Sequence, residues 1–114
     1  MGYDSIGELE MMIMLAVLRL GTNAYGITIR DELAKRGGRS RSFGTIYTTL
    51  DRLSEKGFVT SRLGDPTAER GGRAKKFFEL TTKGRITLEA TVNSRRSLEN
   101  GLGFKNPALH GAAQ

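Results

Sequence analysis

The sequence contains no cysteine and only one histidine, His110. Without cysteine the chain forms neither a disulfide nor a thiolate metal site, and a single histidine cannot supply a cluster of imidazole ligands. We therefore expect no metal site, no cofactor and no catalytic residue. The nearest approach to a carboxylate pair, Asp51 with Glu55, falls one turn apart on a charged helix surface, where we expect both groups to be solvated.

Long apolar runs are also missing. The longest, from Met11 to Leu18, is far shorter than the roughly 20 residues that cross a membrane. Acidic residues Asp4, Glu8 and Glu10 precede it, where a signal peptide would carry positive charge. We therefore expect a cytoplasmic protein with no membrane contact. A chain of 114 residues with 38% hydrophobic content suits one core, which disfavours a catalytic domain with a deep cleft.

Positive charge is present in excess, and it is concentrated in the middle of the chain. The sequence has 18 Lys and Arg against 12 Asp and Glu, a net charge of +6. Residues 30–76 hold twelve basic and six acidic residues, net +6, whereas residues 1–29 have net −2 and residues 77–114 net +2. Such concentration favours an anionic partner, although a solvated charged face explains it equally well.

Hydrophobic periodicity predicts three helices in the first half of the chain. The first runs from about residue 5 to 20, and the second, from 25 to 36, ends at Gly37 and Gly38. The third runs from about 42 to 56, with Ser40 or Ser42 as its N-cap.

The second half changes character. Residues 58–63 and 74–80 are rich in β-formers and predict two strands of a hairpin around a glycine-rich turn. Thr81 then caps a fourth helix that ends near residue 100.

The third predicted helix has two contrasting faces. On one side are apolar residues that we expect in the core: Phe43, Ile46, Leu50 and Leu53. On the other side are small polar residues and one cation: Thr45, Thr48, Thr49 and Arg52. Tyr47 lies between the faces, as either a buried ring or a phosphate contact, and we favour the phosphate contact.

This order of elements is typical of a winged helix-turn-helix, and the expected fold class is mainly α with a small β-hairpin wing. In that arrangement the third helix enters the DNA major groove and the wing contacts the backbone beside it. We assign the recognition helix Arg41, Ser42, Thr45, Tyr47, Thr48, Thr49 and Arg52. We assign the wing Arg70, Arg73, Lys75 and Lys76.

The expected domains are a DNA-binding domain (residues 1–80), a C-terminal dimerisation helix (81–100) and a flexible tail (101–114). The fourth helix has a thin apolar stripe and the first a broad one, so both are poorly covered by a single small domain. We therefore expect a homodimer whose interface contains Met11, Met12, Leu15, Leu88, Val92 and Leu98.

Several short motifs occur together between residues 8 and 98. They are Tyr25-Gly26, Gly44-Thr45-Ile46-Tyr47 followed by Leu50, Arg52 and Leu53, then Gly57, Gly71-Gly72-Arg73 with Lys75-Lys76, and Leu80-Thr81 with Gly84. In combination they resemble the PadR family of bacterial transcriptional regulators. The resemblance implies a homodimeric repressor that binds an inverted repeat in double-stranded DNA, with its C-terminal helix packed against the first helix of the other subunit. It also implies release by a small, frequently aromatic inducer, whose identity the sequence does not give.

The chain departs from the family pattern at Phe77-Phe78, where tyrosines are frequent, and this favours a place in the core for both rings. With one helix after the wing, it resembles the short subgroup. The absence of tryptophan argues against a ligand site built on aromatic stacking between subunits. The alternative function is a winged-helix module that binds a protein partner without specific DNA binding, and an enzyme is a distant third.

Overall fold

The computed structural model describes residues 5–64 and 74–105. Its elements, in chain order, are α1 (Glu8–Leu20), the 3-10 turn η1 (Gly21–Asn23), α2 (Gly26–Arg36), α3 (Phe43–Glu55), β1 (Val59–Leu63), β2 (Lys76–Leu80) and α4 (Thr82–Glu99). This architecture, mainly helical with one antiparallel hairpin, confirms the expected fold class.

The first helix begins three residues later than expected. Its N-cap is Gly7, whose amide donates a hydrogen bond of 2.7 Å to Glu10 Oε1. A carboxylate that accepts from the N-cap amide marks the start of a helix. The helix therefore starts at Glu8, and Ser5 lies outside it.

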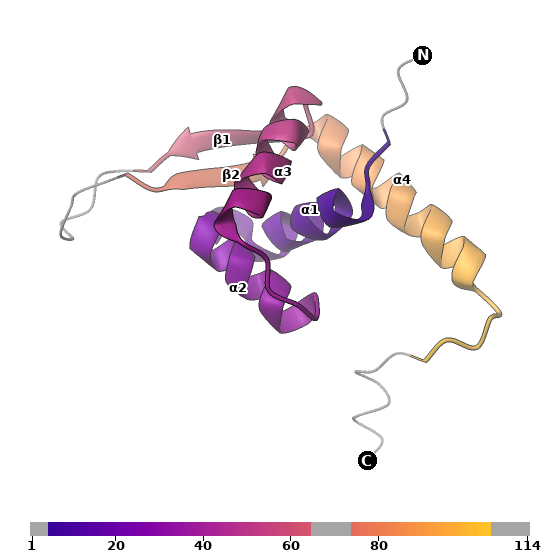
Figure 1. Ribbon diagram of the computed structural model, residues 1–114. Helices are drawn as coiled ribbons and strands as arrows, with labels where there is room; N and C mark the ends of the chain where they lie inside the picture. The colour runs from indigo at the N-terminus through magenta and orange to yellow at the C-terminus, as the bar shows by residue number, and fades with distance from the viewer. Residues whose placement is uncertain (1–4, 65–73, 106–114) are drawn as a thin grey trace.

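The core is built around α1, which contacts α2, α3, α4 and β2. In Figure 1, α1 lies in the middle of the helical body, the hairpin extends on one side and α4 on the other. The largest fully buried side chains come from every helix and from the residue before β1: Ile13, Met14, Val17, Ile29, Ile46, Leu50, Leu53, Phe58 and Leu88. One continuous cluster thus fixes α3 and the hairpin on the same support.

The start of α4 is tied to the end of α3. Thr81 donates its hydroxyl to the Gly57 carbonyl and its amide to the Phe58 carbonyl, and its hydroxyl oxygen caps α4 by accepting from the Gly84 amide at 2.9 Å. Gly84 is buried against the Phe58 backbone, so that any side chain there would clash with the Phe58 carbonyl. A glycine is therefore needed to let the two segments approach.

No helix of residues 5–64 and 74–105 is long and apolar enough to cross a membrane. Over the same part of the chain, no three Asp, Glu or His side chains gather in a way that would hold a metal ion.

Candidate nucleic-acid interface

The N-terminus of α3 is closed by Ser42. Its hydroxyl oxygen accepts from the Thr45 amide at 3.1 Å, and its hydroxyl donates to Thr45 Oγ1 at 3.0 Å. Of the two serines in the linker, Ser42 is therefore the N-cap. Ser42 and Thr45 are both exposed, so this capped end is open to a ligand.

The exposed face of α3 is narrower than the sequence predicts. Thr45, Thr48 and Arg52 are exposed, as expected. Thr49 is only 4% exposed, and its hydroxyl donates to the Thr45 carbonyl at 2.8 Å. The assignment of Thr49 to the DNA-contacting face is wrong, because position 49 lies three residues after Ile46 and so borders the buried stripe.

Phe43 also differs from its expected place. Ile46, Leu50 and Leu53 are fully buried, but Phe43 is 36% exposed. As the first residue of α3, it lies beyond the edge of the core, and its ring contacts other side chains at the surface instead. The guanidinium carbon of Arg30, on α2, lies 4.4 Å from the ring centroid of Phe43.

Tyr47 is 40% exposed, and its hydroxyl group packs on Gly26, the first residue of α2. An added Cβ at Gly26 would clash with the Tyr47 hydroxyl and would lie 2.8 Å from its Cζ. The Tyr25-Gly26 and Tyr47 motifs thus meet in space. Tyr47 is therefore a rim residue, and its proposed phosphate contact stays a prediction.

The end of the hairpin that is nearest to its turn contacts the start of α2 through aromatic rings. Tyr25 and Phe77 meet edge to face with centroids 5.4 Å apart. Lys75 Nζ lies 4.6 Å from the Tyr25 centroid, and the Arg62 guanidinium lies 4.8 Å from the Phe77 centroid. Cation–π contacts of this kind hold flexible cationic side chains in place. Two positive charges are thus fixed at the turn end of the hairpin strands.

Phe77 and Phe78 have different environments. Phe78 is buried in the core, as expected, whereas Phe77 is half-buried beside Tyr25. Lys76 is exposed on β2. The other two predicted wing residues, Arg70 and Arg73, lie outside the described residues.

Arg62 also lies among the cations of the wing, although it is not one of the wing residues predicted from the sequence. It lies on β1 directly opposite Phe77. The signal that identifies it is cross-strand pairing, which depends on the hairpin register. That register cannot be read from a strand with no clear alternation of polar and apolar residues.

Among the described residues, the cations near α3 and the wing have no carboxylate partner. Within the described ranges, no ion pair forms at Arg39, Arg41, Arg52, Arg62, Lys75 or Lys76. Several cations elsewhere are matched: Arg19 and Arg36 with Glu32, and Arg85 with Glu89. Charges that are not neutralised within the chain produce a local positive potential that attracts a polyanion.

An ion pair braces the C-terminal end of α3. Lys56 Nζ lies 3.0 and 2.9 Å from the two carboxylate oxygens of Glu10 and donates to the Ser5 carbonyl at 3.1 Å. Burial by itself raises the pKa of Glu10, but hydrogen bonds from Lys56 and the Gly7 amide, with the charges of Lys56 and Arg52, outweigh burial and hold that pKa below its ordinary value. The carboxylate is therefore ionised at neutral pH and fixes α3 on α1.

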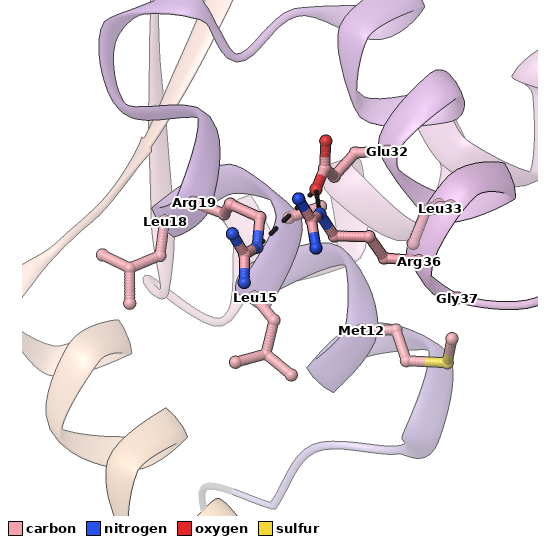
Figure 2. A pocket seen from close by; sticks show the side chains of 9 residues that line it. Met12, Leu15, Leu18, Arg19, Glu32, Leu33, Arg36 and Gly37 are labelled. Atoms are coloured by element: carbon pink, nitrogen blue, oxygen red, sulfur yellow. Dashed lines mark ion pairs between the residues drawn. The ribbon is translucent and has the colours of Figure 1, made fainter. Parts of the chain in front are cut away.

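A separate apolar groove of about 660 Å³ lies between α1 and α2. Figure 2 shows Met12, Leu15 and Leu18 around it, with Arg19 and Arg36 converging on Glu32. Arg36 Nε lies 2.6 Å and Arg19 Nε 3.6 Å from Glu32 Oε2.

The six residues expected at a dimer interface divide into two groups. Met11 and Leu88 are 4% and 1% exposed in the single chain, so both are core residues. Leu15 and Leu98 are exposed, and Met12 and Val92 are half-buried. Only these four have surface to offer to a second copy.

Comparisons with known proteins agree with this geometry. Among solved structures, the chain is similar to a PadR family transcription regulator from Clostridium difficile, with 22% identity over 82% of this chain and 92% of that one and a TM-score of 0.68. It is similar to a PadR-like transcription factor from Bacteroides fragilis, with 26% identity over 82% and 85% and a TM-score of 0.64. A Bacillus subtilis PadR in complex with operator DNA is 28% identical over 74% of this chain and 46% of that one, with a TM-score of 0.61.

A search of curated proteins finds no match. The model of the transcriptional regulator PadR-like family matches residues 14–90, from the middle of α1 to the middle of α4. The matched segment includes every described residue of the candidate interface. The chain therefore belongs to the PadR-like family of transcriptional regulators.

Proposed function

We propose that the protein is a homodimeric repressor that binds an inverted repeat in double-stranded DNA. In this proposal α3 lies in the major groove, and Arg52, with Thr45 and Thr48, faces the bases. Lys75, Lys76 and Arg62 at the wing contact phosphates, which position the protein without selecting sequence. Such a regulator works in the cytoplasm, where it meets the promoter.

The observation that carries the proposal is a set of cations without an ion pair among the described residues, which lie on the linker before α3, on α3 and at the turn end of the hairpin. A surface that binds a neutral protein partner has no need for cations without partners, since their desolvation opposes binding. A phosphate backbone supplies the missing charges. The related Bacillus subtilis PadR bound to operator DNA supports the same choice.

The homodimer is supported by two apolar surfaces that the single chain leaves uncovered. Leu15 and Leu18 line the groove beside α1, and Leu98 near the end of α4 is 79% exposed. In Figure 1, α4 extends away from the helical body. We propose that α4 of a second copy covers α1 of the first, and the reverse by symmetry.

Binding to duplexes selected from a random pool, measured across salt concentrations, tests this function. Contact with roughly six to ten phosphates predicts a loss of about 10³- to 10⁵-fold in affinity between about 50 and about 200 mM salt. An enriched palindrome would support the inverted repeat and its symmetry together. Affinity that does not change with salt, or strong binding to a protein with no duplex affinity at low salt, would contradict the proposal.

Two variants separate the expected roles of α3 and the wing. Arg52→Ala should cost about 1–3 kcal/mol on the selected duplex and relax preference at one base position. Lys75→Ala should weaken selected and random duplexes alike and reduce the salt slope by about 1. Lys105→Ala, which removes an equal charge from the exposed segment after α4, serves as control and should leave affinity nearly unchanged.

Whether bound protein represses transcription is tested with a reporter gene placed behind the selected duplex. Repression should disappear with the Arg52→Ala variant. Increased transcription on binding would show an activator instead.

A further inference from the structure

Phe43 places a partly exposed aromatic ring at the N-terminal end of α3. Phe43 is the first residue of α3 and follows the cap, Ser42. Phe43 is 36% exposed, although Ile46, Leu50 and Leu53 of the same helix are fully buried. Transfer of an aromatic side chain out of water is favourable, so a ring left open at this place has surface available for a partner.

The ring is not free to turn away into solvent. Arg30, on α2, places its guanidinium 4.4 Å from the ring centroid, and the Tyr47 ring, one turn further along α3, lies 6.4 Å away with an interplanar angle of 32°. These neighbours hold Phe43 on the same exposed end of α3 as Ser42 and Thr45.

The major groove has one apolar feature that an aromatic ring can recognise. Thymine carries a C5-methyl group there, whereas the other three bases present hydrogen-bonding groups. N-terminal residues of a recognition helix are those that contact base edges. Phe43 has no hydrogen-bonding group, so the methyl group is the base-edge feature that it can select.

Building on the proposed DNA binding, we propose that Phe43 is a specificity-determining residue that contacts a thymine methyl group in each half-site. Arg30 stacks on the ring and also lies 3.5 Å from the Asp31 carboxylate, so that it holds the ring in place. The preference for thymine at that position then comes from apolar contact, and it is separate from any base contact of Arg52.

Replacement of thymine by deoxyuridine tests the contact, because deoxyuridine pairs like thymine and lacks only the methyl group. The full chain is first used to select a duplex from a random pool, and each thymine of the half-site is then replaced in turn. At one position the wild-type protein should bind about three- to fivefold more weakly, the effect of one methyl-sized group removed from water. Phe43→Ala should bind the thymine and deoxyuridine duplexes equally at that position.

Two further variants complete the design. Phe43→Leu keeps an apolar side chain and should keep part of the thymine preference, which guards against a folding defect of the alanine variant. Ile86→Ala removes an exposed apolar side chain from α4 and should keep the full preference.

The contact is contradicted if wild-type protein tolerates every deoxyuridine, or if Phe43→Ala keeps the preference, which would assign the methyl contact to another side chain such as Thr45 or Thr48. Enrichment of a duplex without methyl dependence overturns only the contact. Failure to enrich any duplex overturns the proposed DNA binding and the contact together.

Discussion

Single residues outside the candidate interface decide where the interface lies. Glu10 belongs to α1, yet its carboxylate holds both the Gly7 amide at the start of α1 and the Lys56 ammonium just after α3. Glu10 is almost fully buried, so this pair loses less to solvent screening than the surface pairs do. One ionised side chain therefore reinforces the position of α3 on α1, which the apolar core also fixes.

Glu10→Gln should lower the free energy of unfolding by about 1.5–3 kcal/mol at neutral pH, because the hydrogen bonds made to a charged group are lost. The pKa of Glu10 is lowered in the folded protein, so its contribution is full above its ordinary pKa of 4.5 and is lost as the pH falls through the folded value. Denaturant unfolding of both proteins from pH 7 down to pH 3 measures this. The two stabilities should converge in acid, and a constant difference would contradict the assignment.

A matched control is Glu89→Gln, which removes a carboxylate paired with Arg85 where both side chains are 59% exposed. An exposed pair of this kind contributes about 0–1 kcal/mol. The control should therefore change stability little at any pH.

Among the elements, α3 combines a folding requirement with a binding surface at the same residue. Ser42 caps the helix and is one of the residues that we propose to lie on DNA. A capping side chain must carry an oxygen that accepts a hydrogen bond from the helix. A side chain that contacts DNA must also not repel the negatively charged phosphates. The two roles can therefore be separated by substitution.

Ser42→Ala should lower stability by about 1 kcal/mol, because the Thr45 amide loses its acceptor. Ser42→Asp should retain stability, since aspartate caps equally well, but should weaken duplex binding through repulsion of phosphates. Thermal unfolding and duplex titration measure the two effects separately. Ser40→Ala, in the same linker but not at the cap, should change stability little, and a loss equal to that of Ser42→Ala would refute the cap.

At the scale of the whole molecule, some apolar side chains remain exposed to solvent after the chain has folded. The described part of the chain leaves Leu15, Leu18 and Leu98 exposed on α1 and α4. Within the described part of the chain, no other element covers these side chains. A symmetric pair of chains can cover them, and it would also present two copies of α3 to an inverted repeat.

Leu98→Glu should convert the protein from dimer to monomer at micromolar concentration without unfolding it, because Leu98 is 79% exposed in the single chain. Sedimentation equilibrium measures the mass, and circular dichroism checks the fold. Leu63→Glu is the control, since it charges a similarly exposed leucine on the hairpin and should stay dimeric. A monomeric wild-type protein would refute the dimer, and with it the symmetric binding of an inverted repeat.

Sequence patterns alone predicted the order of the elements, the cap at Thr81 and the excess of positive charge between residues 30 and 76. They limited the cap of α3 to Ser40 or Ser42, and the structure shows that it is Ser42. These are local properties, because caps depend on neighbouring residues and helices on a short period of apolar positions. The resemblance to the PadR family was also detectable in the sequence, because the family motifs are short segments with characteristic residues.

The tertiary structure decided which residues of a predicted face are exposed. Thr49, Met11 and Leu88 are buried and Phe43 is not, although the residue patterns of α3, α1 and α4 predicted otherwise. Burial depends on where the neighbouring elements end, and the spacing of apolar residues along one helix carries no information about that. The same holds for Tyr47 on Gly26, Arg62 over Phe77 and Lys56 on Glu10, since each joins residues that are distant in the chain and meet only when the core packs.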